Sequence, residues 1–187
     1  MYGNKIKTDK NQARVRIIKY IKGRVESLNT NVRMELREAV LEVGNLDIVD
    51  IFNRMSELKT ISKEIYFLEA AKVVERTSNI LKGAKNENIG EVDKKLFRED
   101  LEQKVWDAYL SSKDNIQNLI DKEEYREATK EYGQAFYKVL HEFFDKVLVN
   151  VEDRAVRVNR LAMMRAINRL YTERIADLAK LPQIVVK

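Results

Sequence analysis

The scarcity of proline and glycine is the feature that most constrains the fold of this chain. Its 187 residues include one proline and six glycines. Strands joined by tight turns need these two residue types at many points, because they adopt the backbone angles that turns require. Long helices joined by short connections need far fewer of them. The sequence therefore predicts an all-α fold, an antiparallel bundle of about seven helices.

Apolar residues recur at three- and four-residue spacing along most of the chain, which is the period of a helix with one buried face. Aspartates stand where they can cap two of these helices, Asp47 before the third and Asp121 before the sixth. Pro182 lies just past the end of the last helical pattern, near Leu181, and marks its end. The pattern predicts helices over residues 13–28, 32–43, 48–58, 62–81, 97–119, 122–144 and 154–181.

The domain organisation predicted from this pattern is simple. Residues 1–12 are polar and lack periodicity, so they are expected to form a flexible lead-in or the start of a cloned fragment. Residues 13–187 are expected to form one helical domain, with breaks at residues 29–31 and 44–45 and a loop over residues 83–93.

Charge and composition restrict the partners. The chain carries 35 lysines and arginines against 30 acidic residues, a net charge of +5, which permits an anionic partner without requiring one. Cysteine is absent, so disulfides and thiolate nucleophiles are excluded, and no apolar run approaches the length of about 20 residues that a membrane span needs. We expect a soluble, cytoplasmic protein with no membrane partner.

The sequence lacks the residue patterns that common enzyme active sites require. The segment that begins His141-Glu142 looks like half of a zinc-protease helix, but His141 is the only histidine and no second ligand follows. Glu142 and Asp145 are better explained as a solvated face. Nucleotide-binding glycine loops and a Gly-x-Ser-x-Gly elbow are also absent. We therefore expect no catalytic residue, no metal site and no cofactor in this chain.

One segment resembles a known family. The 20 residues from Phe143 to Ala162 read FFDKVLVNVEDRAVRVNRLA. They fit the pattern F-F-D-x-V-x-V-x-x-E-D-x-x-x-R-x-N-R-L-A, which is similar to the end of bacterial glycyl-tRNA synthetase beta subunits. Residues 21–28 and 75–81 resemble further family segments, and the resemblance covers most of residues 14–180. Thr77 and Asn150 depart from the residues common in the family.

The resemblance implies a function. This chain would be the C-terminal, DALR-type anticodon-binding domain of a beta subunit, and it would position glycine tRNA for aminoacylation. In the parent enzyme, an alpha2beta2 assembly, the alpha subunit would use ATP and Mg to activate glycine, so the chain alone would be non-catalytic. The alternative is a helical protein-interaction or assembly domain that does not contact RNA.

Four arginines of the last predicted helix are candidate tRNA-binding residues. Arg154, Arg165 and Arg169 fall on one side of this helix at about 100° per residue, whereas Arg157 lies near Arg160, toward the apolar side. The guanidinium fork suits phosphate, and such contacts position RNA without reading its bases. The competing interpretation of these residues is a solvated charged face.

Other residues of the family signature are expected to serve the architecture. Arg160 lies on the apolar side of the last helix, so we expect it to be partly buried and tied either to a carboxylate, such as Asp145 or Glu152, or to a helix-end carbonyl. Asn159 is expected to brace the preceding turn. Asp153, with Glu152, precedes the helix as an acidic start.

Overall fold

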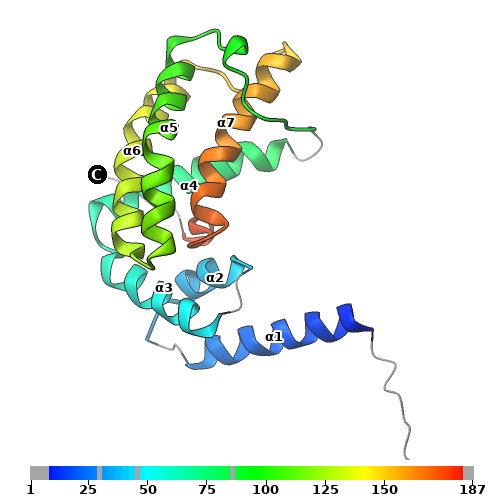
Figure 1. Ribbon diagram of the computed structural model, residues 1–187, viewed down its shortest axis with the longest axis vertical. Coiled ribbons are helices and arrows are strands. Elements are labelled where there is room, and N and C mark those ends of the chain that lie inside the picture. Colours follow the sequence, from blue (N-terminus) through cyan, green and yellow to red (C-terminus); the bar gives the residue numbers. More distant parts are fainter. Residues whose placement is uncertain (1–8, 29–30, 45–46, 85–86, 183–187) are drawn as a thin grey trace, which may run out of the picture.

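The computed structural model describes residues 9–28, 31–44, 47–84 and 87–182, and over these ranges it is helical and contains no strand (Figure 1). The predicted all-α fold is therefore confirmed. Its elements are α1 (Lys10–Leu28), α2 (Met34–Glu42), α3 (Ile48–Ile61), α4 (Ile65–Gly83), η1 (Lys94–Leu96), α5 (Asp100–Asp121), α6 (Tyr125–Lys146), α7 (Arg154–Thr172) and η2 (Leu178–Lys180).

Helices α4 to α7 form the main bundle. α6 packs between α4 and α5, and α7 packs on both α4 and α5 (Figure 1). The inward residues of α6 carry the expected spacing: Tyr132, Phe136 and Leu140 are buried, and the ring of Tyr132 lies 4.9 Å from that of Tyr171 in α7. α2, α3 and η2 cover one end of this bundle. Among the described helices, none combines the length and apolarity needed to cross a membrane.

A small residue lets two of the helices approach closely. Gly133 of α6 faces the backbone of α4, where a Cβ at position 133 would lie 2.5 Å from the carbonyl oxygen of Tyr66 and 3.2 Å from the backbone nitrogen of Ala70. A residue larger than glycine would push α4 and α6 apart. The close approach of α4 and α6 therefore depends on the absence of a side chain at residue 133.

Two of the expected helix starts are confirmed by the hydrogen bonds of their caps. Asp47 accepts from the backbone nitrogen of Val49 at 2.9 Å at the start of α3, and Asp153 accepts from that of Ala155 at 2.9 Å at the start of α7. The cap predicted at Asp121 is wrong. Asp121 is the last residue of α5, and its carboxylate accepts a 2.7 Å bond from Arg174.

A turn separates Asp121 from α6. Glu123 adopts a left-handed backbone with φ of 59°, and Glu124 holds the N-cap position without a side-chain hydrogen bond. The chain therefore needs three residues to reverse direction after α5, which delays the start of α6 to Tyr125.

The last helix is shorter than predicted. α7 ends at Thr172, not near Leu181, because the chain then folds back over α2 and α3. The backbone nitrogen of Asp177 donates to the carbonyl of Ala39 at 2.8 Å, and the buried Arg54 donates to the carbonyl of Ile175 at 2.8 Å. These hydrogen bonds to α2 and α3 replace the backbone hydrogen bonds that would continue α7.

Other boundaries differ little. α1 begins at Lys10, three residues before the predicted start, and the end of α4 at Gly83 agrees with the predicted start of the following loop. The rest of the expected lead-in (residues 1–8) and parts of the predicted breaks and loop (residues 29–30, 45 and 85–86) lie outside the described residues.

Candidate nucleic-acid interface

α7 divides into a buried side and a charged side, as its sequence predicts. Eight of its apolar residues are buried in the bundle: Val156, Leu161, Ala162, Met163, Met164, Ile167, Leu170 and Tyr171. The four candidate arginines lie outside this row, and each makes at least one polar contact with the protein itself. These contacts decide how much of each guanidinium is open to a partner.

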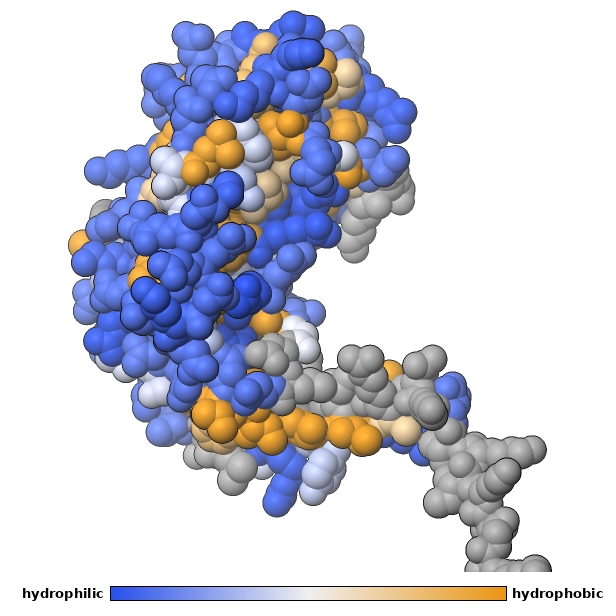
Figure 2. Space-filling model, in the orientation of Figure 1, coloured by the Kyte–Doolittle hydropathy of each residue, from blue (hydrophilic) through white to orange (hydrophobic). Residues whose placement is uncertain are grey.

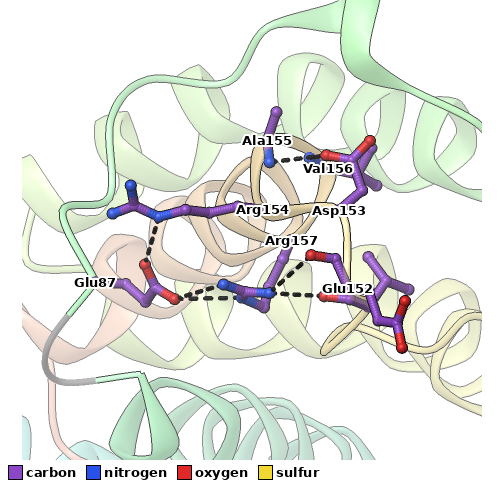
Figure 3. Close-up of polar contacts among 8 residues, drawn as sticks. Glu87, Glu152, Asp153, Arg154, Ala155, Val156 and Arg157 are labelled. Carbon is purple, nitrogen blue, oxygen red and sulfur yellow. Dashed lines mark hydrogen bonds and ion pairs between the residues drawn. The ribbon is translucent and has the colours of Figure 1, made fainter.

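Arg154 and Arg157 converge on one carboxylate (Figure 3). Arg154 Nε lies 3.4 Å from Glu87 Oε2, and Arg157 donates to Glu87 Oε1 from Nε at 3.2 Å and from Nη2 at 3.0 Å. Hydrogen bonds from Arg157 and then Arg154 lower the pKa of Glu87. Arg157 Nη1 also donates to the carbonyls of Val151 at 2.7 Å and Glu152 at 3.4 Å. Arg157 therefore joins the segment before α7 to the segment after α4.

Arg165 and Asn159 hold the next part of the same segment. Arg165 donates to the carbonyls of Ile89 and Gly90, each at 2.7 Å. The side-chain amide of the buried Asn159 clamps the backbone of Asp93, accepting from its nitrogen at 2.8 Å and donating to its oxygen at 3.0 Å. The expected bracing of the preceding turn by Asn159 is wrong, because its amide points across to another segment instead.

The remaining arginines present more of their heads to solvent. The Arg154 side chain is 71% exposed and that of Arg169 is 56% exposed, with Arg169 paired to Glu173 at 3.0 Å one turn along the chain.

An open groove of about 500 Å³ lies beside the start of α7. Its lining residues are Asn88, Gly90, Glu91, Leu96, Arg154, Ala155, Val158 and Asn159.

Arg160 is buried and paired, as expected, but its partner is a different carboxylate. Its Nε donates to Glu102 Oε1 at 2.9 Å, and its Nη1 donates to the carbonyl of Leu148 at 2.8 Å. Both charged side chains are at most 5% exposed. The predicted partners lie elsewhere: Asp145 contacts His141 Nδ1 at 2.8 Å, and Glu152 is exposed.

Glu102 was missed by the sequence reasoning because it belongs to a different helix. Its carboxylate also accepts the backbone nitrogens of Arg98 at 2.6 Å and Glu99 at 2.8 Å, which forms a capping box at the start of α5. Burial alone would raise the pKa of Glu102, but the hydrogen bonds from Arg160 and these two nitrogens outweigh burial and lower that pKa. The Glu99-x-x-Glu102 spacing is the local signal that could have identified the cap.

The segment around the single histidine has the features of a solvated face. The side chains of His141 and Asp145 are more than half exposed, and Glu142 forms a 2.7 Å pair with Lys146. Within the ranges that the structure describes, no three acidic or histidine side chains come together as a potential metal site.

This chain is similar to glycine-tRNA ligase beta subunits from several organisms. A glycine-tRNA ligase beta subunit from Syntrophus aciditrophicus strain SB is 25% identical over 95% of this chain and 25% of its own length. Those from Trichlorobacter lovleyi and Desulforudis audaxviator strain MP104C are 29% and 30% identical, over 95% and 76% of this chain and 25% and 20% of their own lengths. The chain therefore spans about a quarter of the length of these relatives.

A family model covers the part of the chain that contains the candidate interface. The model of the DALR anticodon binding domain matches residues 71–175, more than half of the chain. The match begins within α4 and ends just beyond α7, so it includes α5, α6 and all four candidate arginines. This chain belongs to the DALR anticodon binding domain family.

Proposed function

We propose that this chain is a tRNA-binding domain of a glycine-tRNA ligase beta subunit and that it holds the anticodon arm of glycine tRNA. The family match over residues 71–175 carries this proposal, and the similarity to beta subunits over nearly the whole chain supports the choice of glycine. The domain positions the tRNA while an alpha subunit, using ATP and Mg, performs the chemistry in a cytoplasmic alpha2beta2 assembly. The domain itself needs no cofactor.

In this proposal the arginine side of α7 contacts the RNA backbone. Arg154 and Arg169 are the principal donors, because their heads are exposed and their pairs with Glu87 and Glu173 lie near the surface. A surface ion pair contributes only about 0–1 kcal/mol, so a phosphate can replace the carboxylate at little cost. Arg157 and Arg165 add positive charge beside them while most of their hydrogen bonds hold residues 87–90 and 151–152 in place.

Binding of glycine tRNA across a salt series tests this assignment. The double variant Arg154→Gln with Arg169→Gln should bind more weakly, and its salt slope should fall by roughly 0.7–0.9 units per lost phosphate contact. Arg165 is left unchanged, since its removal would leave the carbonyls of Ile89 and Gly90 without their partner. A matched control removes two exposed lysines of α6, Lys130 and Lys138. Equal affinity and slope in the two double variants would exclude the α7 arginines from the interface.

An assembly role is the second candidate function. Large apolar side chains are exposed in the first turns of three helices: Met34 in α2, Ile48 and Val49 in α3, and Ile65 in α4. The relatives are about four times longer than this chain, so such residues could pack against another part of a longer protein. Stable binding to the remainder of a beta subunit, without any affinity for tRNA, would favour this function over the first.

A further inference from the structure

The positive charge of the chain is concentrated at one end. Of the 35 lysines and arginines and 30 acidic residues, residues 1–28 contain eight basic and two acidic ones, which leaves 27 basic and 28 acidic residues in the rest of the chain. α1 alone has six basic residues and one acidic residue in 19 positions. Residues 71–175, the part matched by the family model, contain 20 basic and 19 acidic residues, so this part contributes only +1 to the net charge that would attract an anionic partner over a distance.

α1 projects from the helical body. It packs against α2, and it runs away from the bundle toward its own N-terminal end (Figure 1). Val25 near its inner end is 2% exposed, whereas Ile17 two turns earlier is 58% exposed and Tyr20 is 68% exposed. Figure 2 shows a band of hydrophobic residues along this helix. We call α1 the arm; the side chains that the structure describes as exposed along it include Val15, Arg16, Ile17, Lys19, Tyr20 and Arg24.

Three basic side chains of this arm are not engaged by any residue in the part of the chain that the structure describes. Arg16, Lys19 and Arg24 are exposed, and their charged groups form no ion pair with any residue in the described ranges. The exposed arginines of α7 differ in this respect, because Arg154 and Arg169 each have a glutamate partner. A phosphate that meets these three side chains displaces no carboxylate of the described residues.

We infer that α1 is a second RNA-binding element, a basic arm that contacts the sugar-phosphate backbone and offers Tyr20 for stacking on an unpaired base. Arginine-rich and lysine-rich helices bind RNA through backbone charge, and aromatic rings stack on bases whatever their identity. This inference rests on the proposed function in one respect: the RNA is taken to be the tRNA held by the rest of the domain.

The distribution of charge favours RNA over an anionic membrane. At 100° per residue, the six basic positions of α1 are spread round the whole circumference of the helix. A helix that lies on a bilayer needs one broad face without charges to bury among the lipids. In α1, Arg24 directly precedes Val25 and borders the row of Ile17, Ile21 and Val25. Such a helix suits an anionic polymer that can contact it from more than one side.

A pair of charge-matched variants of the full chain tests the arm. The first combines Arg16→Gln, Lys19→Gln and Arg24→Gln. The second combines Lys104→Gln, Lys130→Gln and Lys138→Gln, which removes equal charge from exposed positions of α5 and α6. Circular dichroism and thermal melting verify that both remain folded. Glycine tRNA is titrated against each over a range of salt concentrations.

The arm variant should bind about tenfold or more weakly than the control, with a salt slope smaller by roughly 2 units if all three contacts are made. Tyr20→Ala should weaken binding about fivefold or more without changing the slope. If the arm variant and the control bind equally while the unaltered chain binds well, the inference is overturned and the proposed function stands.

The remaining outcomes separate the two proposals. If the unaltered chain does not bind glycine tRNA, the proposed function fails, and the arm is then tested with an unstructured RNA oligonucleotide. Equal binding of this oligonucleotide by the two triple variants overturns the arm on its own, and weaker binding by the arm variant supports it. Binding of the chain to phosphatidylserine vesicles but to neither RNA would also overturn the inference and assign the arm to a membrane surface.

Discussion

Arg160 and Glu102 form the buried ion pair of the α5–α7 contact, and the two residues lie 58 positions apart in the chain. Replacing Arg160 with alanine should destabilise the protein by about 3–5 kcal/mol, because the carboxylate of Glu102 would keep its burial and lose its partner. Replacing the exposed Arg169 should cost only about 0–1 kcal/mol. Urea unfolding of both variants measures the difference, and equal small changes would contradict the structural role of Arg160.

The same pair predicts a dependence of stability on pH. Because the pKa of Glu102 is lower in the folded protein than in the unfolded chain, its contribution is fully present above the unfolded value of about 4.3. It is lost as the pH falls through the folded pKa. The difference in unfolding free energy between the wild type and Glu102→Gln should therefore be greatest near neutral pH and shrink below about pH 4. A difference that stays constant from pH 7 to pH 3 would show that Glu102 does not titrate in this way.

At the residue scale, the sequence predicts whether a polar side chain is buried better than it predicts which residue that side chain contacts. The position of Arg160 on the apolar side of α7 is a local property, so its burial could be foreseen. The identity of Glu102, and of the Asp93 backbone that Asn159 clamps, depends on how distant segments pack. No spacing within α7 contains that information.

At the element scale, helix boundaries set by neighbouring residues were predicted, whereas a boundary set by a distant segment was not. The caps at Asp47 and Asp153 bond to nitrogens two residues ahead, so sequence alone can identify them. The end of α7 depends on α2 instead, where the carbonyl of Ala39 accepts from Asp177. The buried Leu178 keeps the apolar spacing of a helix beyond the true end, which accounts for the overlong prediction.

The packing of α4 on α6 gives a prediction at this scale. Gly133→Ala should destabilise the protein by about 1–3 kcal/mol, because the new methyl group would overlap the carbonyl oxygen of Tyr66 and force the helices apart. Gly83→Ala is the control, since a Cβ at position 83 meets nothing within 4 Å among the described residues. Thermal melting compares the two, and a Gly133→Ala variant as stable as the control would contradict the close approach.

At the scale of the whole molecule, the excess of positive charge lies outside the region that matches the family model. The match covers residues 71–175, whereas the excess of basic residues lies in α1 and the residues before it. Residues 1–12 were expected to form a lead-in, and the helix predicted over residues 13–28 was not among the expected RNA contacts. The net charge of the whole chain does not reveal that the basic residues gather at one end. In the structure α1 projects from the helical body, so its basic residues can reach an anionic partner (Figure 1).

The central claim is that the domain holds the anticodon arm, and the most direct measurement compares two RNAs. One is a complete glycine tRNA transcript, and the other joins its acceptor and TΨC arms without the anticodon arm. Affinities for the unaltered chain are measured at one low salt concentration, because phosphate contacts dominate binding and depend on salt. The account predicts at least tenfold tighter binding of the complete tRNA. Equal affinity for the two RNAs would contradict it.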